Sequence, residues 1–429
     1  MINWIYETEI FMNYCVRYLA ILGSVLSCTS AVSFAGIQSN IPFGHGTWLY
    51  DGIYDSTGKK LPPQAGMFVD QLSQYNKSAN LNSQISQIYA YGGDIEMYCG
   101  GSGESDPSAI CTPNDLLVVY YPPQVISKAN NNWDFLLKTT GDSGYSSVQQ
   151  YKNVFGSKNN VIVLDGRMDN INLKQYDYLD HLNTLNAEDA QHFANKIAKS
   201  ICASDDVDGV QFDIEPFSFV GEGGSFPGTG QQFFYTELAK DFAGYYGNAS
   251  DPDGINQDPS KDPFHCVDAK HPQGRFFSVF TFASKVTSAV ATVFTHHGNG
   301  MIVDSLYDLG IKPGGEFNTV LEFTALVNTE MKLMKGIAAT YGLSYKFAIP
   351  AAASAHEFES KNGIPTGQKQ LDYVKAAILA IQPETLKATD PNFKGVDIWS
   401  WNQSMWWHGM QFTPAQPDNA TLSYLATNL

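Results

Sequence analysis

Residues 208–215 read Asp208-Gly209-Val210-Gln211-Phe212-Asp213-Ile214-Glu215, and this stretch constrains the fold more than any other. Side chains on a β-strand alternate between its two faces, so Gln211, Asp213 and Glu215 share one face. The other face carries the apolar Val210, Phe212 and Ile214. Two carboxylates therefore stand side by side at the end of an apolar strand. Because each negative charge raises the pKa of the other, one of them can hold a proton near neutral pH and act as a general acid.

The same spacing resembles the Asp-Gly-x-Asp-x-Asp-x-Glu signature of family 18 glycoside hydrolases, which include chitinases and endo-β-N-acetylglucosaminidases. Gln211 is the departure, since the family has its middle Asp at this position. An amide can donate a hydrogen bond but cannot ionise. The loss of a nearby negative charge is expected to lower the pKa of Asp213. We therefore expect either activity with a shifted pH optimum or weak activity.

Eight short β-branched or aromatic runs alternate along the chain with amphipathic, helix-like segments such as 187–201 and 321–341. The runs are residues 47–54, 87–98, 160–168, 207–214, 276–282, 301–307, 345–351 and 395–401. This order predicts an α/β fold, a (β/α)8 TIM barrel. Segments 99–150 and 216–270, rich in Gly, Pro, Asn and Ser, are expected to be loop insertions after strands 2 and 4. A doubly wound open sheet is the alternative, but no Gly-rich phosphate loop follows an early strand.

Residues 1–35 have the pattern of a signal peptide, with an apolar run over 18–26 after Arg17 and small residues near Ala35. Glu7 and Glu9 suit such a segment poorly, so Met12 is an alternative start. Cys28 lies in a faint lipoprotein-like cleavage box, a minor alternative. The apolar run is too short to span a bilayer. Residues 36–429 are expected to form a single catalytic domain that is monomeric, not inserted in the membrane, and secreted to the extracellular space or periplasm.

The formal net charge of −17 argues against a nucleic-acid partner, because a phosphate backbone requires a basic surface. Four of the six cysteines follow residue 35, and four cysteines allow three pairings. We favour Cys99 with Cys111, which would close a Gly- and Ser-rich loop, and therefore Cys202 with Cys266. No Cys-x-x-Cys pattern or nearby His suggests a metal site, and neither a metal nor a cofactor is expected.

Two further segments resemble parts of the same family. Tyr307-Asp308 follows the sixth predicted strand in a segment similar to the family's Met-x-Tyr-Asp, with Ser305 in place of Met. Trp399 lies in the last predicted strand, where the family has the Trp that forms the floor of the sugar site; Trp401, Trp406 and Trp407 could line further subsites. Flat aromatic faces of this kind bind the apolar face of a sugar ring.

The resemblance implies a role for each matched residue. Glu215 would donate a proton to the glycosidic oxygen, while Asp213 would orient the substrate acetamide and stabilise the oxazolinium ion. Tyr307 would hydrogen-bond the acetamide carbonyl, and Trp399 would form the floor of the site. Gln211, Asp308 and Tyr91 are expected to contact substrate, and Asp208 to support the strand.

The function expected from these features is hydrolysis of β-1,4 bonds next to N-acetylglucosamine, with retention through an oxazoline formed by the substrate itself. Both chitin oligomers and the chitobiose core of N-glycans remain open as substrates. The alternative is a non-catalytic chitinase-like sugar-binding protein. Such relatives usually lose the acid, so Glu215 favours the enzyme whereas Gln211 favours the alternative. A barrel with an unrelated ligand is the third possibility.

Overall fold

The chain divides into two units, residues 1–35 and residues 36–429. The computed structural model describes residues 39, 41–49, 65–97, 116–120, 159–166, 185–203, 205, 207–214, 226, 228–245, 262–309, 312, 317–351, 364–402 and 417–429. All of them belong to the second unit. The expected signal peptide, Cys99, Cys111 and Glu215 lie outside the described residues.

The described strands form one nine-stranded sheet in the order β1-β9-β8-β7-β6-β5-β4-β2-β3, and β1 also pairs with β2. All the pairings except that of β2 with β3 are parallel. The β1–β2 pairing therefore closes eight parallel strands into a barrel, which confirms the predicted fold. The strands are β1 His45–Leu49, β2 Ile85–Met97, β3 Leu116–Tyr120, β4 Asn159–Gly166, β5 Gly209–Ile214, β6 Phe276–Thr281, β7 Gly300–Asp304, β8 Ser344–Pro350 and β9 Phe393–Asn402.

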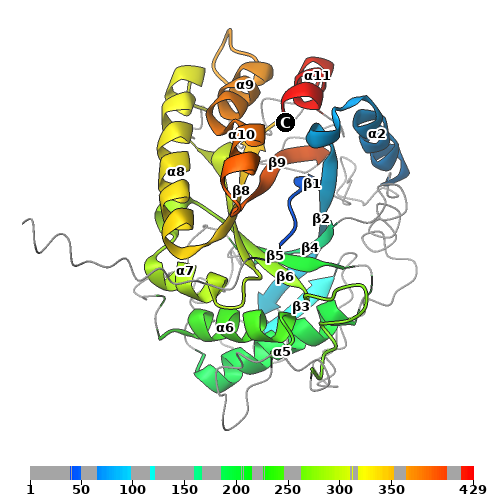
Figure 1. The fold of residues 1–429 in the computed structure, drawn as a ribbon, viewed down its shortest axis with the longest axis vertical. Coiled ribbons are helices and arrows are strands. Elements are labelled where there is room, and N and C mark those ends of the chain that lie inside the picture. The colour runs from blue at the N-terminus through cyan, green and yellow to red at the C-terminus, as the bar shows by residue number, and fades with distance from the viewer. Residues whose placement is uncertain are drawn as a thin grey trace, which may run out of the picture. The chain divides into compact units, whose positions relative to one another are not determined.

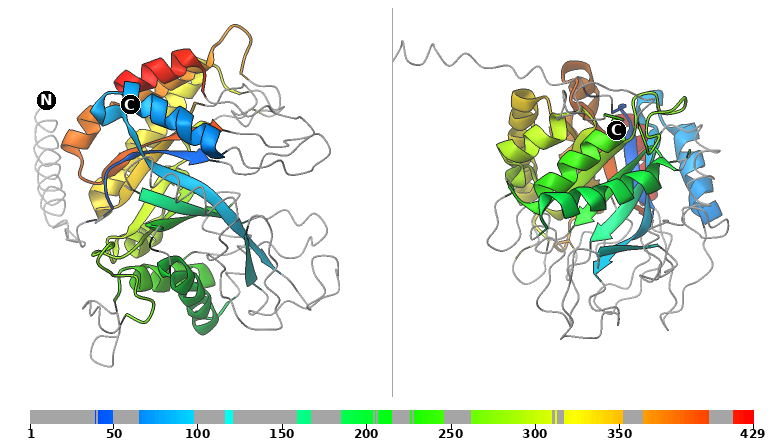
Figure 2. Two further views of the ribbon diagram at one scale, coloured as in Figure 1. Left: turned by 90° about the vertical axis from the view of Figure 1, so that its right-hand side faces the viewer. Right: turned by 90° about the horizontal axis from the view of Figure 1, so that it is seen from below.

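Helices surround this ring of strands (Figure 1). They are α2 Ala65–Ser78, α5 Ala187–Cys202, α6 Gly230–Phe242, α7 Ser288–Thr295, α8 Val320–Tyr341, α9 Gln370–Ile381, α10 Pro383–Thr389 and α11 Asn419–Asn428, with the 3-10 turns η1 Leu81–Ser83, η5 Ala283–Lys285 and η6 Leu306–Asp308. Capping explains where the long helix α8 begins and ends. Thr319 and Glu322 form a reciprocal capping box at its start, and Gly342, with a φ of 72°, ends it. The C-terminal helix α11 packs against α2 and α9 (Figure 2).

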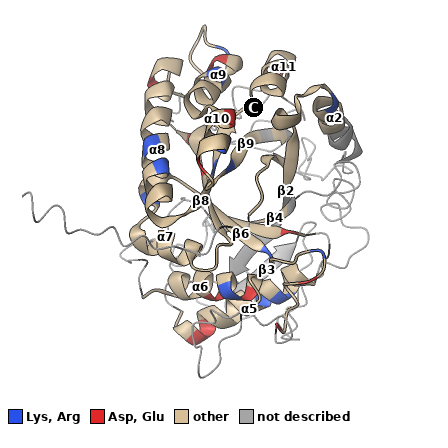
Figure 3. Cartoon of the chain, viewed as in Figure 1, with Lys and Arg blue, Asp and Glu red and all other residues tan. Residues whose placement is uncertain are grey.

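The barrel has two hydrophobic cores, and the alternation of side chains along each strand separates them. An outer core fills the space between strands and helices and includes Val210, Phe212, Phe277 and Ile302. An inner core fills the barrel itself and includes Trp48, Tyr89, Phe280, Tyr307 and Trp399. On α8, Met331 and Met334 face the outer core as the helical period predicts, whereas Leu326 is exposed. Among the described residues, the charged ones belong mainly to the surrounding helices and connecting segments (Figure 3).

Two details of the strands differ from the prediction. An additional strand, β3, lies within the predicted 99–150 insertion and pairs antiparallel with the end of β2. The sixth barrel strand, β7, ends at Asp304 and not at Tyr307, because residues 306–308 turn into η6.

The predicted disulfide between Cys202 and Cys266 is present and joins the end of α5 to the segment before β6. Among the described residues, we find no helix with the length and apolar character needed to cross a membrane.

Candidate active site

The strand that carries the motif is β5, and its side chains alternate between the outer core and the barrel interior, as predicted. Val210 and Phe212 face the outer core. Gln211 faces the barrel interior, where its Oε1 accepts a hydrogen bond from Trp48 Nε1 at 2.7 Å. Asp213 is two residues further along the strand and therefore shares this inward face, with 7% of its surface exposed. The described part of β5 ends at Ile214, so Glu215, the last residue of the motif, lies outside the described residues.

The glycine of the motif has a packing role at the opposite end of this strand. A Cβ added to Gly209 would collide with the carbonyl oxygen of Phe276 on the neighbouring strand β6. Gly209 pairs directly with Phe276 in the parallel register. A side chain here would therefore push β5 and β6 apart, so the motif needs glycine for strand packing and not for catalysis.

Four aromatic side chains gather inside the barrel, and we call Trp48, Phe280, Tyr307 and Trp399 the aromatic cluster. Tyr307 and Trp399 stack with their ring centroids 4.5 Å apart and 17° between their planes. Phe280 stacks on Tyr307 at 5.1 Å. Trp48 meets Phe280 at 5.1 Å and Trp399 at 5.3 Å, both edge to face. The two residues singled out from separate sequence segments, Tyr307 and Trp399, are therefore in direct contact.

The bond between Trp48 and Gln211 joins the aromatic cluster to β5. Strands β1 and β5 are not neighbours in the sheet, so this bond crosses the barrel interior. An indole N–H can only donate, which fixes the Gln211 amide with its oxygen toward Trp48 and its NH2 group on the other side. Within the described part of the chain this NH2 group has no hydrogen-bond partner, although the side chain is fully buried. Ser278, which pairs with Gln211 in the β5–β6 register, likewise has a buried hydroxyl without a partner among the described residues.

The remaining predicted substrate contacts are more dispersed. Asp308 follows Tyr307 in η6 and is partly buried. Tyr91 lies in β2 beside an irregularity in the β2–β4 register, and its side chain is not described. Trp401 faces the outer core and contacts Tyr75 of α2 edge to face at 5.4 Å, so it does not line the interior with Trp399. Trp406 and Trp407 lie outside the described residues.

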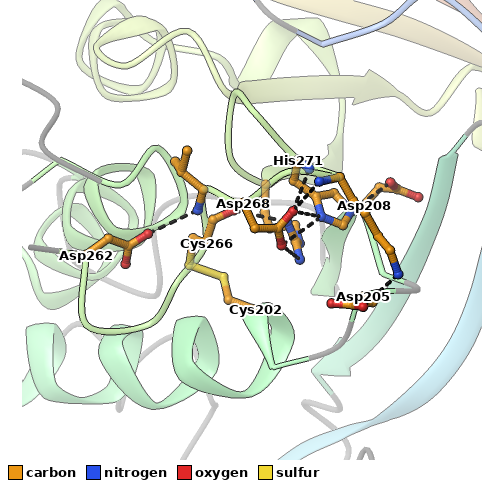
Figure 4. Close-up of polar contacts among 10 residues, drawn as sticks. Cys202, Asp205, Asp208, Asp262, Cys266, Asp268 and His271 are labelled. Carbon is orange, nitrogen blue, oxygen red and sulfur yellow. Dashed lines mark hydrogen bonds and ion pairs between the residues drawn. A yellow bond between two sulfur atoms is a disulfide. The ribbon is translucent and has the colours of Figure 1, made fainter. Parts of the chain in front are cut away.

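Asp208 lies at the N-terminal end of β5, away from the carboxyl ends of the strands, and Figure 4 shows its surroundings. Its Oδ1 lies 3.2 Å from His271 Nε2, and His271 Nδ1 lies 3.1 Å from Asp268 Oδ1. Arg275 continues the network, donating from Nη2 to Asp268 Oδ2 at 3.2 Å and from Nη1 to the Cys266 carbonyl at 3.0 Å. These contacts tie the start of β5 to the segment that bears the disulfide.

Several residues that shape the interior were missed in the sequence. Trp48 lies in a predicted strand and Phe280 alternates with other inward residues of β6, but nothing in either segment marks it as part of a site. Lys346 and Asp397 carry a visible signal, because each is a charged residue within a run of buried apolar ones. They form an ion pair with both side chains fully buried.

Neither a known family model nor any curated protein matches this sequence. Solved structures do match at low similarity. The second catalytic domain of the group II chitinase of Ostrinia furnacalis shows 11% identity and a TM-score of 0.40, over 90% of this chain and 96% of that one. The endo-1,4-β-D-mannanase of Thermotoga petrophila shows 10% identity and a TM-score of 0.42, over 90% and 98%. The xylanase and α-amylase inhibitor protein of Scadoxus multiflorus shows 10% identity and a TM-score of 0.38, over 83% and 93%. Similarity this low gives no information on activity, and the fold rests on the strand order.

Proposed function

We propose that this protein is a glycoside hydrolase of the family 18 type, acting on β-1,4 bonds next to N-acetylglucosamine. The main support is the hydrogen bond from Trp48 to Gln211 of β5. Because Trp48 also contacts Trp399, which stacks on Tyr307, this bond links the three predicted segments inside one barrel. Active sites of such barrels lie at the carboxyl ends of the strands, where Asp213 stands. Glu215 is proposed as the proton donor and Asp213 as the group that orients the acetamide. Tyr307 is proposed to hydrogen-bond the acetamide carbonyl, with retention through an oxazoline.

The aromatic cluster supports a sugar as the ligand. Aromatic faces bind the apolar face of a pyranose ring, while nearby polar groups bind its hydroxyl and amide groups. The NH2 group of Gln211 and the hydroxyl of Ser278 supply such polar groups beside Asp213. Trp399 is only 3% exposed, so a sugar reaches its indole only after neighbouring groups move. Binding should therefore change the tryptophan fluorescence.

A second candidate, a sugar-binding barrel without turnover, is favoured by one observation. Gln211 is fully buried and neutral, so no second carboxylate stands at this position to exchange a proton with Asp213. For either candidate we propose a secreted monomer, extracellular or periplasmic. The Cys202–Cys266 disulfide supports that location, because disulfides persist in oxidising compartments.

The test compares the wild type with Glu215→Gln and with the control Glu188→Gln, whose site is exposed on the outer helix α5. Each protein is incubated across pH with chitotriose-type oligomers and, separately, with N-glycoproteins, while binding is followed by tryptophan fluorescence. We expect the wild type and the control to release product. Glu215→Gln should bind but lose roughly 100-fold or more in rate, as expected for removal of a general acid.

The other outcomes separate the alternatives. If wild type and Glu215→Gln bind sugar equally and neither releases product, the protein is a sugar-binding barrel. If the wild type binds neither substrate class, both sugar-based functions are wrong. Product from only one class decides between chitin oligomers and the chitobiose core.

A further inference from the structure

Beneath the aromatic cluster, the barrel interior contains a fully buried polar network built on an ion pair. Lys346 of β8 and Asp397 of β9 are paired, and each side chain has 0% of its surface exposed. Tyr89 of β2 donates its hydroxyl to Asp397 Oδ2 at 2.8 Å and accepts a hydrogen bond from Gln87 Nε2 at 2.7 Å. Lys346 Nζ also donates to Gln87 Oε1 at 3.2 Å. The network thus joins three strands of the barrel.

Stability does not explain why such a pair is present. Removing two charges from water is unfavourable, and a buried pair is often no more stable than apolar residues of the same size. The fold nevertheless accommodates it closely. A Cβ on Gly46 would lie 2.9 Å from the Tyr89 ring and would overlap Asp397 Oδ1, so this glycine makes room for both. What the pair does supply is a fixed direction for every group bonded to it.

The fixed group that matters is Tyr89, because the ion pair holds its hydroxyl end while Trp48 stacks on its ring. Lys346 Nζ lies 5.3 Å from the ring centroid, and Trp48 stacks on the ring at 4.5 Å with 12° between the planes. The plane of the Trp48 indole is therefore set by Tyr89, while its N–H direction is set by Gln211. Trp48 in turn packs its edge against Trp399 at 5.3 Å. An unbroken series of contacts leads from the ion pair to the proposed sugar site.

We infer that Lys346 and Asp397 are positioning residues: by fixing Tyr89 they fix Trp48, and through Trp48 they orient the Gln211 amide beside Asp213. Neither charged group touches the substrate. The consequence for sugar binding rests on the proposed function, whereas the coupling of the ion pair to Trp48 does not.

The test uses the indole N–H resonances of the full chain, which has seven tryptophans. The Trp48 resonance is assigned by its loss in Trp48→Phe. It is then followed in Asp397→Asn, in Lys346→Met and in the double variant K346M/D397N. The double variant leaves no buried charge unpaired, so it can be measured even if a single variant fails to fold. Val327→Ala on α8 is the control, because it truncates a fully buried side chain of the outer core.

We expect the Trp48 resonance to shift and its hydrogen exchange to quicken about tenfold in the ion-pair variants, as for the loss of one hydrogen bond. The control should lower the melting temperature without moving this resonance. Chitotriose affinity should weaken about tenfold in the same ion-pair variants, with little change in the affinity of the control.

An unmoved Trp48 resonance in the double variant overturns the coupling. A moved resonance with unchanged chitotriose affinity overturns the role in the sugar site. A wild type that does not bind chitotriose contradicts the proposed function separately, since the Trp48 resonance still decides whether the ion pair positions the indole.

Discussion

At the scale of single residues, Gln211 is where this barrel departs from the family it resembles, and the structure gives the amide a defined place. Its oxygen is the acceptor that the Trp48 indole requires, and its side chain spans the interior from β5 to β1. An aspartate side chain is one methylene shorter, so from the same backbone position its oxygens would lie farther from Trp48. In this chain Gln211 and Trp48 therefore form one hydrogen-bonded unit.

We predict that Gln211→Glu makes stability depend on pH. The carboxyl keeps the acceptor for Trp48, but burial beside Asp213 raises its pKa above the ordinary value of about 4.3. The folded state then binds the proton more tightly than the unfolded state. The variant should therefore match the wild type near pH 4 and lose roughly 1–3 kcal/mol as the pH rises to 7.5. Thermal unfolding at both pH values measures this.

Gln211→Met is the matched control, because it has a similar length and no charge. It leaves the Trp48 N–H without an acceptor, and its cost should be the same at both pH values. An equal deficit for Gln211→Glu at pH 4 and pH 7.5 would show that the site is not closed to water.

At the scale of elements, β7 and α8 each contribute one buried carboxyl group to the space between the barrel strands and the outer helices. Asp304 ends β7 on its outward face and is fully buried, and Glu330 of α8 accepts from the backbone N–H of Ser284 at 3.0 Å. Burial, followed by the charge of Glu330, raises the pKa of Asp304 well above its ordinary value. At the start of the same helix Glu322 shows the opposite behaviour. Its hydrogen bonds with Lys312 and Thr319 lower its pKa to about 2.

We predict opposite pH dependences for the two matched variants Asp304→Asn and Glu322→Gln. A raised pKa in the folded state means that Asp304 contributes stability below pH 3.8, which is lost as the pH rises through the raised value. Asp304→Asn should therefore gain melting temperature relative to the wild type between pH 4 and pH 8. The low pKa of Glu322 contributes stability above pH 4.5 that is lost toward pH 2. Glu322→Gln should therefore be less stable than the wild type at pH 7, and the difference should shrink toward pH 3.

Thermal unfolding of both variants across this range is the measurement. If Asp304→Asn and the wild type keep a constant difference from pH 4 to pH 8, Asp304 does not hold its proton in the way that its burial implies.

At the scale of the whole molecule, the disulfide and the Asp208–His271 contact brace the same end of the barrel. Cys202 ends α5 and Cys266 precedes β6, and their bond spans a sequence separation of 64 residues that includes β5 and α6. The polar network around His271 connects this segment to the start of β5 (Figure 4). The strand that carries Asp213 is therefore held at its N-terminal end by both covalent and polar links.

We predict that C202A/C266A lowers the unfolding free energy by roughly 4 kcal/mol, the value expected for opening a loop of this length. Unfolding in urea, monitored by tryptophan fluorescence, measures the change. Asp208→Asn is a useful companion, because it weakens the polar link and leaves the covalent one intact. It should cost less than the loss of the disulfide, and a double-alanine variant as stable as the wild type would contradict the prediction.

Much of this barrel could be predicted from the sequence, because eight apolar runs with strand-like composition are each a barrel strand. The end of β7 could not, since a 3-10 turn over residues 306–308 looks like strand continuation when neighbouring residues are apolar. In the site, Tyr307 and Trp399 were found through short motifs. Trp48 was not, because its role depends on a contact across the barrel that exists only once β1 and β2 have paired. The pairing of Lys346 with Asp397 was not predicted either, because it depends on the register between the neighbouring strands β8 and β9.

The short strand β3 has one more consequence. Among the described residues, β1 pairs with β2 as far as Ala90, while β2 continues to Met97. Beyond Ala90, β3 pairs with β2 from Gly93 to Met97 and so satisfies the backbone groups on this edge of β2. Open strand edges recruit strands from other molecules and lead to aggregation. The pairing with β3 therefore protects this edge of β2 from pairing with another molecule. We expect a shortened chain without β3 to self-associate along this edge.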